Sequence, residues 1–279
     1  MIVAGGGRVG NMTSDQTSGT TFPRDTVPLN DGNQIPLLGF GTWQIKGDQA
    51  RQSVIWALEA GYRHIDTATI YGNEAEVGAG LRDSGVDRDE VFITTKVPGG
   101  STGREAETLH ASLEKLGTDR VDLWLIHWPT DGGADVQMWQ ALIDAQKQGL
   151  ARSIGVSNYS IPMIDEVLAG TGVTPAVNQI ELSPLLFDRD LIGHHLKRNV
   201  VVEGYSALRG GTLDHPTIVE IAKRHGKSPA QVIIRWHLQR QIVVIPKSVK
   251  RDRIIENAQV ADFELSTEDM DALDGLGSQ

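Results

Sequence analysis

The sequence contains no cysteine, which excludes disulfide bonds, thiol catalysis and cysteine-ligated metal sites. It also has no run of the roughly 18 consecutive apolar residues that a membrane-spanning helix needs. Basic residues are in the minority, because 26 Lys and Arg residues stand against 36 Asp and Glu residues and give a formal net charge of −10. A surface of this sign repels nucleic acid and anionic membranes in general. We therefore expect no nucleic-acid partner and no membrane partner.

The amino-terminal segment 1–25 lacks periodic apolar residues and is rich in Gly, Ser and Thr, which predicts a flexible extension. Gly5, Gly7 and Gly10 fit the dinucleotide-binding pattern G-x-G-x-x-G. That motif needs a buried strand before it and a helix after it, and neither flank predicts one. The segment Met1–Ala4 is too short for a secretory signal, so we expect a cytoplasmic protein.

From residue 26 onward the sequence predicts a regular alternation of strands and helices. Thr26–Leu29 and Gln34–Pro36 flank an Asp-Gly pair, which is typical of a hairpin. The later β-rich segments predict strands at Tyr62–Asp66, Val91–Lys96, Val121–Trp128, Ser153–Ser157, Ala176–Glu181, Val200–Gly204, Ile242–Ile245 and, as the eighth, near Gln259–Phe263. Seven or eight such units with short connections indicate a parallel sheet, closed or doubly wound. Their number and the chain length favour one (β/α)8 TIM barrel over residues 26–279, with a short N-terminal β-hairpin.

Two of the intervening helices carry start and stop signals. Thr102 and Glu105 have the spacing of a capping box, and Gly117 follows a stripe of leucines as a terminator. Asp135 is placed to cap the next helix.

Ionisable residues stand where chemistry occurs in such barrels, at the carboxyl ends of strands. Asp66, Lys96 and His127 end three of the predicted strands, and Tyr71 follows the first of them by a few residues. Taken singly, each has an ordinary structural interpretation as a turn, solvated or packing residue. An acid, an ammonium, a phenol and an imidazole on one rim are harder to explain in that way. Strand alternation also places mostly apolar side chains inside the barrel beneath them.

These four residues, which we call the tetrad, suit the reduction of a carbonyl group. A phenol has a pKa near 10, and a neighbouring ammonium favours the phenolate and lowers that pKa. A carboxylate beside the ammonium holds it in place and keeps it charged. The imidazole can orient a substrate carbonyl by a hydrogen bond. Because no side chain can supply a hydride, a cofactor is required.

Several segments resemble the aldo-keto reductases, in family order and over nearly the whole chain from about Thr26 to Leu276. They are GFGTWQ (39–44), HIDTATIYGNE (64–74), ITTK (93–96), LIHWP (125–129), IGVSN (154–158), NQIELSP (178–184), GYSAL (204–208) and IPKS…R..EN (245–257). The resemblance implies a (β/α)8 barrel that binds NADPH/NADP+ without a Rossmann motif and acts on a small-molecule carbonyl substrate, with the short prokaryotic members as the most similar type. It leaves a monomer as the expected state.

The resemblance also implies roles for individual residues. Tyr71 is implied as the general acid, Asp66 and Lys96 as the pair that tunes it, and His127 as the residue that orients the carbonyl. The implied cofactor-binding residues are Ser157, Asn158 and Gln179 at the carboxamide, Tyr205 under the nicotinamide ring, Ser206 and Leu208 near the pyrophosphate, and Lys247, Ser248, Val249, Arg253, Glu256 and Asn257 at the adenosine 2′-phosphate and adenine.

Two positions depart from the family pattern, and two tryptophans are candidates for substrate contact. Ala207 stands where a Pro is common and Ser183 where a His is common, and neither touches the proton chemistry. We expect an open pocket walled by Trp43 and Trp128. The other tryptophans, Trp56, Trp124, Trp139 and Trp236, are expected in the core.

Two rival functions remain at this point. One is a non-catalytic NADPH-binding, redox-sensing subunit on the same fold, which differs from an enzyme only in its lack of turnover. The other is a metal-dependent hydrolase, which needs clustered His and carboxylate ligands at strand ends. His127 and Asp66 alone do not supply them, and we expect His194 and His195 to lie in an exposed helix. No metal is therefore expected.

Overall fold

The computed structural model describes residues 23, 25–130 and 133–278. The predicted flexible extension, with Gly5, Gly7 and Gly10, lies outside the described residues except for Pro23 and Asp25.

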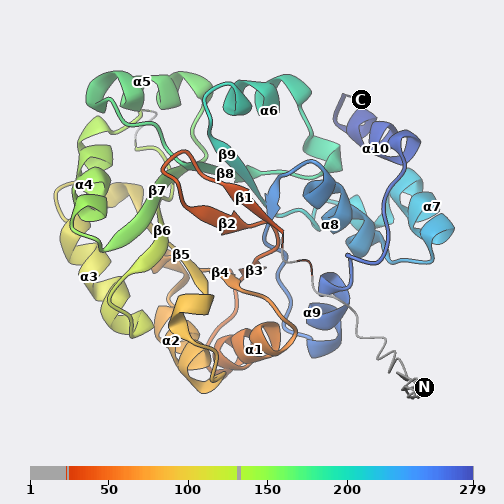
Figure 1. Ribbon diagram of the computed structural model, residues 1–279, viewed down its shortest axis with the longest axis horizontal. Coiled ribbons are helices and arrows are strands. Elements are labelled where there is room, and N and C mark those ends of the chain that lie inside the picture. Colours follow the sequence, from red (N-terminus) through yellow and green to blue (C-terminus); the bar gives the residue numbers. More distant parts are fainter. Residues whose placement is uncertain (1–22, 24, 131–132, 279) are drawn as a thin grey trace, which may run out of the picture.

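An eight-stranded parallel sheet closes on itself as a barrel (Figure 1). Its strands are, in spatial order, β3 (Phe40–Gly41), β4 (His64–Asp66), β5 (Phe92–Val97), β6 (Val121–Ile126), β7 (Ala151–Ser157), β8 (Val177–Glu181), β9 (Val201–Tyr205) and β10 (Val243–Val244). The barrel closes next to β3, where the amide of Gly39 donates to the Val244 carbonyl and the amide of Val244 donates to the Leu37 carbonyl, both at 2.9 Å. The predicted (β/α)8 fold is thereby confirmed.

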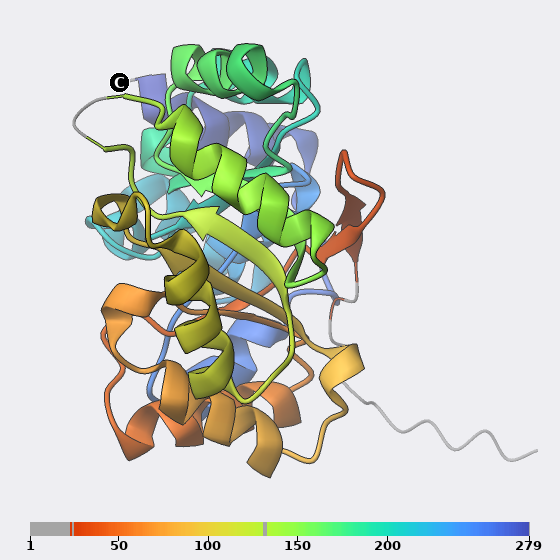
Figure 2. The same ribbon diagram turned by 90° about the vertical axis from the view of Figure 1, so that its left-hand side faces the viewer.

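Helices form the outer layer around the strands (Figures 1 and 2). The described residues hold α1 (Asp48–Glu59), α2 (Glu74–Asp83), α3 (Glu105–Leu116), α4 (Val136–Lys147), α5 (Ile161–Thr171), α6 (Arg189–Leu196), α7 (Pro216–His225), α8 (Pro229–Gln239), α9 (Arg251–Ala258) and α10 (Thr267–Asp274). None of them is both long and apolar enough to cross a bilayer.

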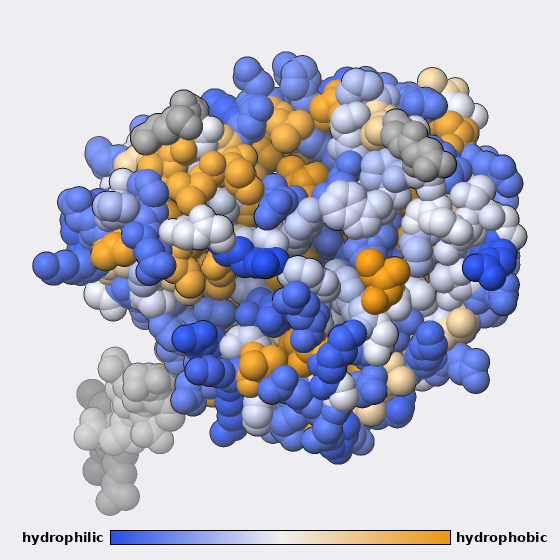
Figure 3. Space-filling model, turned by 180° about the vertical axis from the view of Figure 1, so that it is seen from behind, coloured by the Kyte–Doolittle hydropathy of each residue, from blue (hydrophilic) through white to orange (hydrophobic). Residues whose placement is uncertain are grey.

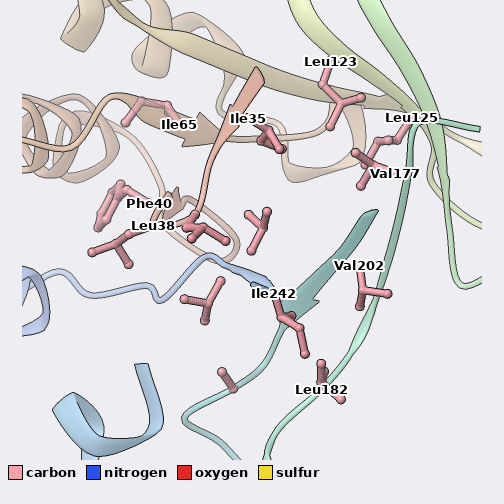
Figure 4. Close-up of a cluster of buried hydrophobic side chains, with 14 of the residues drawn as sticks. Ile35, Leu38, Phe40, Ile65, Leu123, Leu125, Val177, Leu182, Val202 and Ile242 are labelled. Atoms are coloured by element: carbon pink, nitrogen blue, oxygen red, sulfur yellow. The ribbon is translucent and has the colours of Figure 1, made fainter. Parts of the chain in front are cut away.

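The predicted hairpin, β1 (Thr26–Pro28) and β2 (Gln34–Pro36), lies across the amino-terminal end of the barrel (Figure 1). Its turn needs a glycine, because Gly32 has a φ of 90°. The fully buried Ile35 lies in one cluster with Leu123, Leu125 and Val177 of the strands (Figure 4). The hairpin thus closes one end of the barrel and leaves the opposite end for a site.

Seven of the predicted barrel strands begin and end within two residues of the observed ones, but the eighth prediction was wrong. Gln259–Phe263 is a loop after α9, and the remaining strand is β3 at Phe40–Gly41. Two residues give almost no periodic signal, and glycine has a low strand propensity. A glycine is required here all the same, since a Cβ on Gly41 would lie 2.8 Å from the Ile245 carbonyl oxygen.

One of the three predicted helix signals was also wrong. Thr102 donates its hydroxyl to Asp135 at 2.8 Å and does not cap α3, which begins after Arg104 without a side-chain cap. Gly117 ends α3 in the left-handed region, as predicted. Asp135 caps α4 by accepting the Met138 amide at 2.9 Å, which was also predicted.

The barrel interior is less apolar than strand alternation predicted. Leu123 and Leu125 are buried there, but so are His64 of β4 and Glu203 of β9, both fully inaccessible. Because β4 and β9 are not neighbours in the sheet, the 3.8 Å approach of His64 Nε2 to Glu203 Oε1 spans the interior.

The tryptophan and histidine predictions need two further corrections. Trp124, Trp139 and Trp236 are buried, whereas Trp56 is only half-buried and packs against the core from outside. His194 is exposed as expected, but His195 is buried, and its Nε2 lies 2.9 Å from Nδ2 of Asn178. Successive residues of a helix point about 100° apart, so the two histidines of α6 lie on different faces, one exposed and one buried.

Candidate active site

A buried ion pair forms the centre of the tetrad. Lys96 is the penultimate residue of β5 and Asp66 ends β4, and Lys96 Nζ donates to both oxygens of Asp66 at 2.7 and 2.8 Å. It also donates to the Thr67 carbonyl at 2.9 Å, so the ammonium is fully hydrogen-bonded although it is inaccessible to solvent. Burial lowers the pKa of Lys96, but Asp66 opposes this and the net pKa is raised. Lys96 is therefore charged at neutral pH.

Tyr71 brings its hydroxyl to this ammonium. It ends a short 3-10 helix, Thr69–Tyr71, and Lys96 Nζ lies 3.4 Å from Tyr71 Oη. The Thr69 hydroxyl donates to the Lys96 carbonyl at 2.8 Å and fixes the turn against β5. Burial raises the pKa of Tyr71, and Lys96 lowers it by a smaller amount. The expected effect of the ammonium is present, but burial outweighs it in the structure as it stands.

His127 follows β6 and faces Tyr71 across the rim. The two rings meet edge to face with centroids 5.6 Å apart. Burial, together with the charge of Lys96, lowers the pKa of His127 to about 3. Its Nδ1 has no hydrogen-bond partner among the described residues. Because that nitrogen is buried, a neutral imidazole here would meet a substrate carbonyl with Nε2, as a hydrogen-bond donor.

The residues expected at the nicotinamide form one hydrogen-bonded group. Tyr205 donates its hydroxyl to Asn158 Oδ1 at 2.8 Å, and Asn158 Nδ2 donates to Ser157 Oγ at 3.0 Å. Ser157 donates to the Gln179 carbonyl at 2.8 Å, and Gln179 Nε2 donates to Asp66 Oδ2 at 2.9 Å. This chain of bonds connects β9, β7 and β8 to the tetrad, so the positions of the two groups are mechanically linked.

Backbone strain is found at the same rim. Asn158 and Ser206, which directly follow β7 and β9, have φ values of 61° and 57°. Non-glycine residues rarely adopt this region, and such strain persists where the surroundings hold a side chain in a required direction.

Unpaired cations lie at the other end of the rim. Lys247 lies three residues beyond β10, and Arg253 lies in the first turn of α9. Neither forms an ion pair with another described residue, whereas the nearby Arg251 is paired with Glu59 at 3.2 Å. Ser248 Oγ accepts the Lys250 amide at 3.1 Å and donates its proton to the Lys250 carbonyl at 3.4 Å, so one lone pair stays open to a further donor. We call Lys247, Ser248, Arg253, Glu256 and Asn257 the phosphate end.

A single cleft of about 920 Å³ joins the two ends. Figure 3 shows the face on which it opens, opposite the hairpin. The predicted site residues that line it are Trp43, Asp66, Tyr71, His127, Trp128, Ser157, Asn158, Gln179, Tyr205, Ser206, Leu208, Lys247, Ser248, Arg253, Glu256 and Asn257. Val249 does not line it and is half-buried against the core. Lys96 lies behind the wall, where it is reached only through Tyr71 and Asp66.

Aromatic side chains stand at the mouth of the cleft. Trp43 is 40% exposed and Trp128 is 50% exposed, as suits residues that meet a ligand rather than the core. The guanidinium of Arg209 lies 4.9 Å from the ring centroid of Trp43, across the cleft. Sequence reasoning did not include Arg209, because an exposed arginine in a loop gives no signal by itself.

Asn73 was also missed, although it organises the loop that carries Tyr71. Its side-chain amide donates to the carbonyls of Thr42 and Ile45, and its oxygen accepts the Thr67 hydroxyl, all at 2.9 Å. It thereby ties the Trp43 loop to the loop after β4. The signal was available in its position within YGNE, directly after Tyr71.

Among the residues that the structure describes, no group of three or more His, Asp or Glu side chains is arranged to hold a metal ion.

Comparisons with known proteins agree with this geometry. A model of the Aldo/keto reductase family matches residues 37–278. The chain is 46% identical to a glyoxal reductase of Bacillus subtilis over 263 residues, which cover 92% of this chain and 94% of that protein. A crystal structure of an aldo/keto reductase from Brucella melitensis has a TM-score of 0.87 and 46% identity, covering 92% of this chain and all of the other. An aldo-keto reductase of Bombyx mori in complex with NADP has a TM-score of 0.85 and 35% identity, covering 92% and 94% of the two chains.

Proposed function

The chain belongs to the aldo/keto reductase family, and from that premise we propose that it reduces aldehydes or ketones to alcohols with NADPH. The observation that carries the proposal is the single cleft that has the tetrad at one end and two unpaired cations at the other. A dinucleotide with a charged phosphate needs such a distribution of groups.

The residues present fit NADPH. Lys247 and Arg253 offer positive charge that no described carboxylate is paired with, and guanidinium groups bind phosphate in a fork geometry. Tyr205 lies in the wall with its hydroxyl held by Asn158, so its ring is fixed as a flat platform. A solved relative from Bombyx mori is a complex with NADP, which supports the same cofactor here.

In the proposed reaction, bound NADPH supplies a hydride to the carbonyl carbon. Tyr71 donates its proton to the carbonyl oxygen, and Lys96 stabilises the phenolate that remains. Asp66 keeps Lys96 charged and in place. His127, which is neutral, orients the carbonyl oxygen by a hydrogen bond toward Tyr71.

We propose small aldehydes, dicarbonyls or keto-sugars as substrates. The relative from Bacillus subtilis is named a glyoxal reductase, which favours dicarbonyls within this range. Trp43 and Trp128 at the mouth would contact the part of the substrate beyond the carbonyl.

The test is a turnover assay with purified protein, NADPH and a panel of small aldehydes, dicarbonyls and keto-sugars, followed at the absorbance band of reduced nicotinamide. We expect loss of absorbance that depends on the carbonyl compound. A protein that binds NADPH but oxidises it with no member of the panel would contradict the proposal and favour the redox-sensing subunit.

A further inference from the structure

A carboxyl group without a hydrogen-bond partner lies inside the barrel, beneath the tetrad. Glu203 is the third residue of β9, it is fully buried, and neither of its carboxyl oxygens has a hydrogen-bond partner among the described residues. Isolated buried carboxylates are strongly unfavourable, so such a group is retained with a proton or with a function.

The neighbours of Glu203 come from three other strands. His64 Nε2 of β4 lies 3.8 Å from Glu203 Oε1 and is hydrogen-bonded to Thr94 Oγ1 at 3.0 Å. Gln179 is paired in register with Glu203 on the neighbouring strand β8, and its amide donates to Asp66. The charged groups whose electrostatic fields act on Glu203 are Asp66 of β4 and Lys96 of β5.

Burial, more than any single neighbour, keeps Glu203 protonated. Burial raises the pKa of Glu203 to about 8, and Asp66 raises it further, while Lys96 and the nearby side-chain amide of Gln179 oppose the rise. His64 cannot supply a compensating positive charge, because burial lowers its pKa to about 3. At neutral pH the interior beneath the tetrad therefore holds a neutral carboxylic acid beside a neutral imidazole.

We propose that Glu203 is a positioning residue that holds a proton during turnover and controls, through Asp66 and Lys96, how readily Tyr71 gives up its own. The proposal rests on the proposed function. With Glu203 neutral, Asp66 is the one negative charge of the pair that offsets Lys96. The positive charge of Lys96 can then stabilise the Tyr71 phenolate. If Glu203 ionised, a second negative charge would share the same ammonium, and the phenolate would be less stable.

The consequence has a definite sign. Ionisation of Glu203 raises the pKa of both Tyr71 and Lys96. A Tyr71 with a higher pKa is a weaker acid for carbonyl reduction and, in the reverse reaction, less often a phenolate base for alcohol oxidation. Both directions therefore lose rate as Glu203 ionises in mildly alkaline solution.

The test compares Glu203→Gln with the wild type in alcohol oxidation with NADP+ between pH 6 and 10. Gln has the same shape and cannot ionise, so the ratio of the variant rate to the wild-type rate should rise with pH. Removal of one like charge should make that rise on the order of three- to tenfold. Glu203→Asp keeps an ionisable group and should follow the wild-type profile in shape.

Glu74→Gln is the matched control. Glu74 is also buried, but its Oε1 accepts the Thr95 hydroxyl at 2.7 Å on the helical side of β5, away from the tetrad. Its pH profile should have the wild-type shape. A loss of packing alone would change rates equally at every pH, which separates a structural effect from the proposed one.

An infrared measurement gives a readout without turnover. The wild type at pH 7 should show the carbonyl stretch of a protonated, poorly hydrogen-bonded carboxylic acid, and Glu203→Gln should lack it. Absence of that band, or parallel pH profiles for the wild type and Glu203→Gln, would overturn the role of Glu203. A wild type without turnover would instead contradict the proposed function, and with it this role.

Discussion

The charged side chains are buried at one end of the cleft and exposed to solvent at the other. At the tetrad, Lys96 and Asp66 are buried, paired at 2.7 Å and shielded from water. At the phosphate end, Lys247 and Arg253 are exposed and unpaired among the described residues. Charges in a dry, fixed environment act strongly on a neighbouring pKa, whereas exposed charges attract a mobile anion and are screened by salt. The first arrangement suits chemistry and the second suits capture of a ligand.

The largest expected effect on activity comes from removing the proton donor at the tetrad end. Tyr71→Phe should lower the rate of carbonyl reduction about a thousandfold, since general acid catalysis contributes roughly 10²–10⁴. NADPH affinity should stay close to that of the wild type, because the phosphate end is untouched. The absorbance assay measures the rate of reduction, and a fluorescence titration with NADPH measures the affinity. Retained turnover would remove Tyr71 from the donor role.

At the other end, Arg253→Ala should weaken NADPH binding roughly tenfold to a hundredfold, which is the range for a hydrogen bond to a charged group. NADH, which lacks the 2′-phosphate, should be affected much less. Arg251→Ala is the control, since Arg251 lies two residues away and is paired with Glu59. Equal losses for NADPH and NADH would show that Arg253 does not contact the 2′-phosphate.

A change of ionic strength should separate the two ends without any mutation. Raising the salt concentration from 50 to 500 mM should weaken NADPH binding about three- to tenfold through screening of exposed charges. The rate constant at saturating NADPH should change little, because the tetrad is buried. A matching fall in that rate constant would mean that solvent reaches the tetrad.

The smallest expected effect concerns stability and pH. Burial raises the pKa of Glu203 from 4.5 to about 8. The folded chain therefore binds this proton more tightly than the unfolded chain does. The resulting stabilisation is complete below pH 4.5 and is lost as the pH rises toward 8. Between pH 5 and 9 the melting temperature of the wild type should fall on the order of 10 °C further than that of Glu203→Gln, as scanning fluorimetry would show.

The tetrad could be predicted from the sequence because each of its members stands at or just beyond a strand end. Asp66, Lys96 and His127 follow runs of β-branched and apolar residues, and Tyr71 is five residues after Asp66 in His64–Glu74. The carboxyl ends of all strands in a barrel lie on one rim. Residues at strand ends can therefore be placed close together from the sequence alone.

Features that depend on contacts between distant strands could not be predicted in the same way. Glu203 looks like a solvated charge in VVEGY, although its parity with Tyr205 places both on one face of β9. Strand β3 has two residues and a required glycine, so no run of β-rich residues marks it. His195 is buried with its Nε2 near Asn178 of β8, a partner that no local sequence pattern indicates.

The seam between β3 and β10 joins the two shortest strands of the barrel, each of two residues. Few hydrogen bonds hold it, notably those between Gly39 and Val244 and between Gly41 and Pro246. The chain leaves this seam on one side toward Trp43 and on the other toward Lys247, so a ligand in the cleft would touch both flanks. The seam is therefore the place where local opening should be easiest and where a bound dinucleotide should suppress it most. Amide hydrogen exchange at Gly39 and Val244 should then slow down when a ligand occupies the cleft.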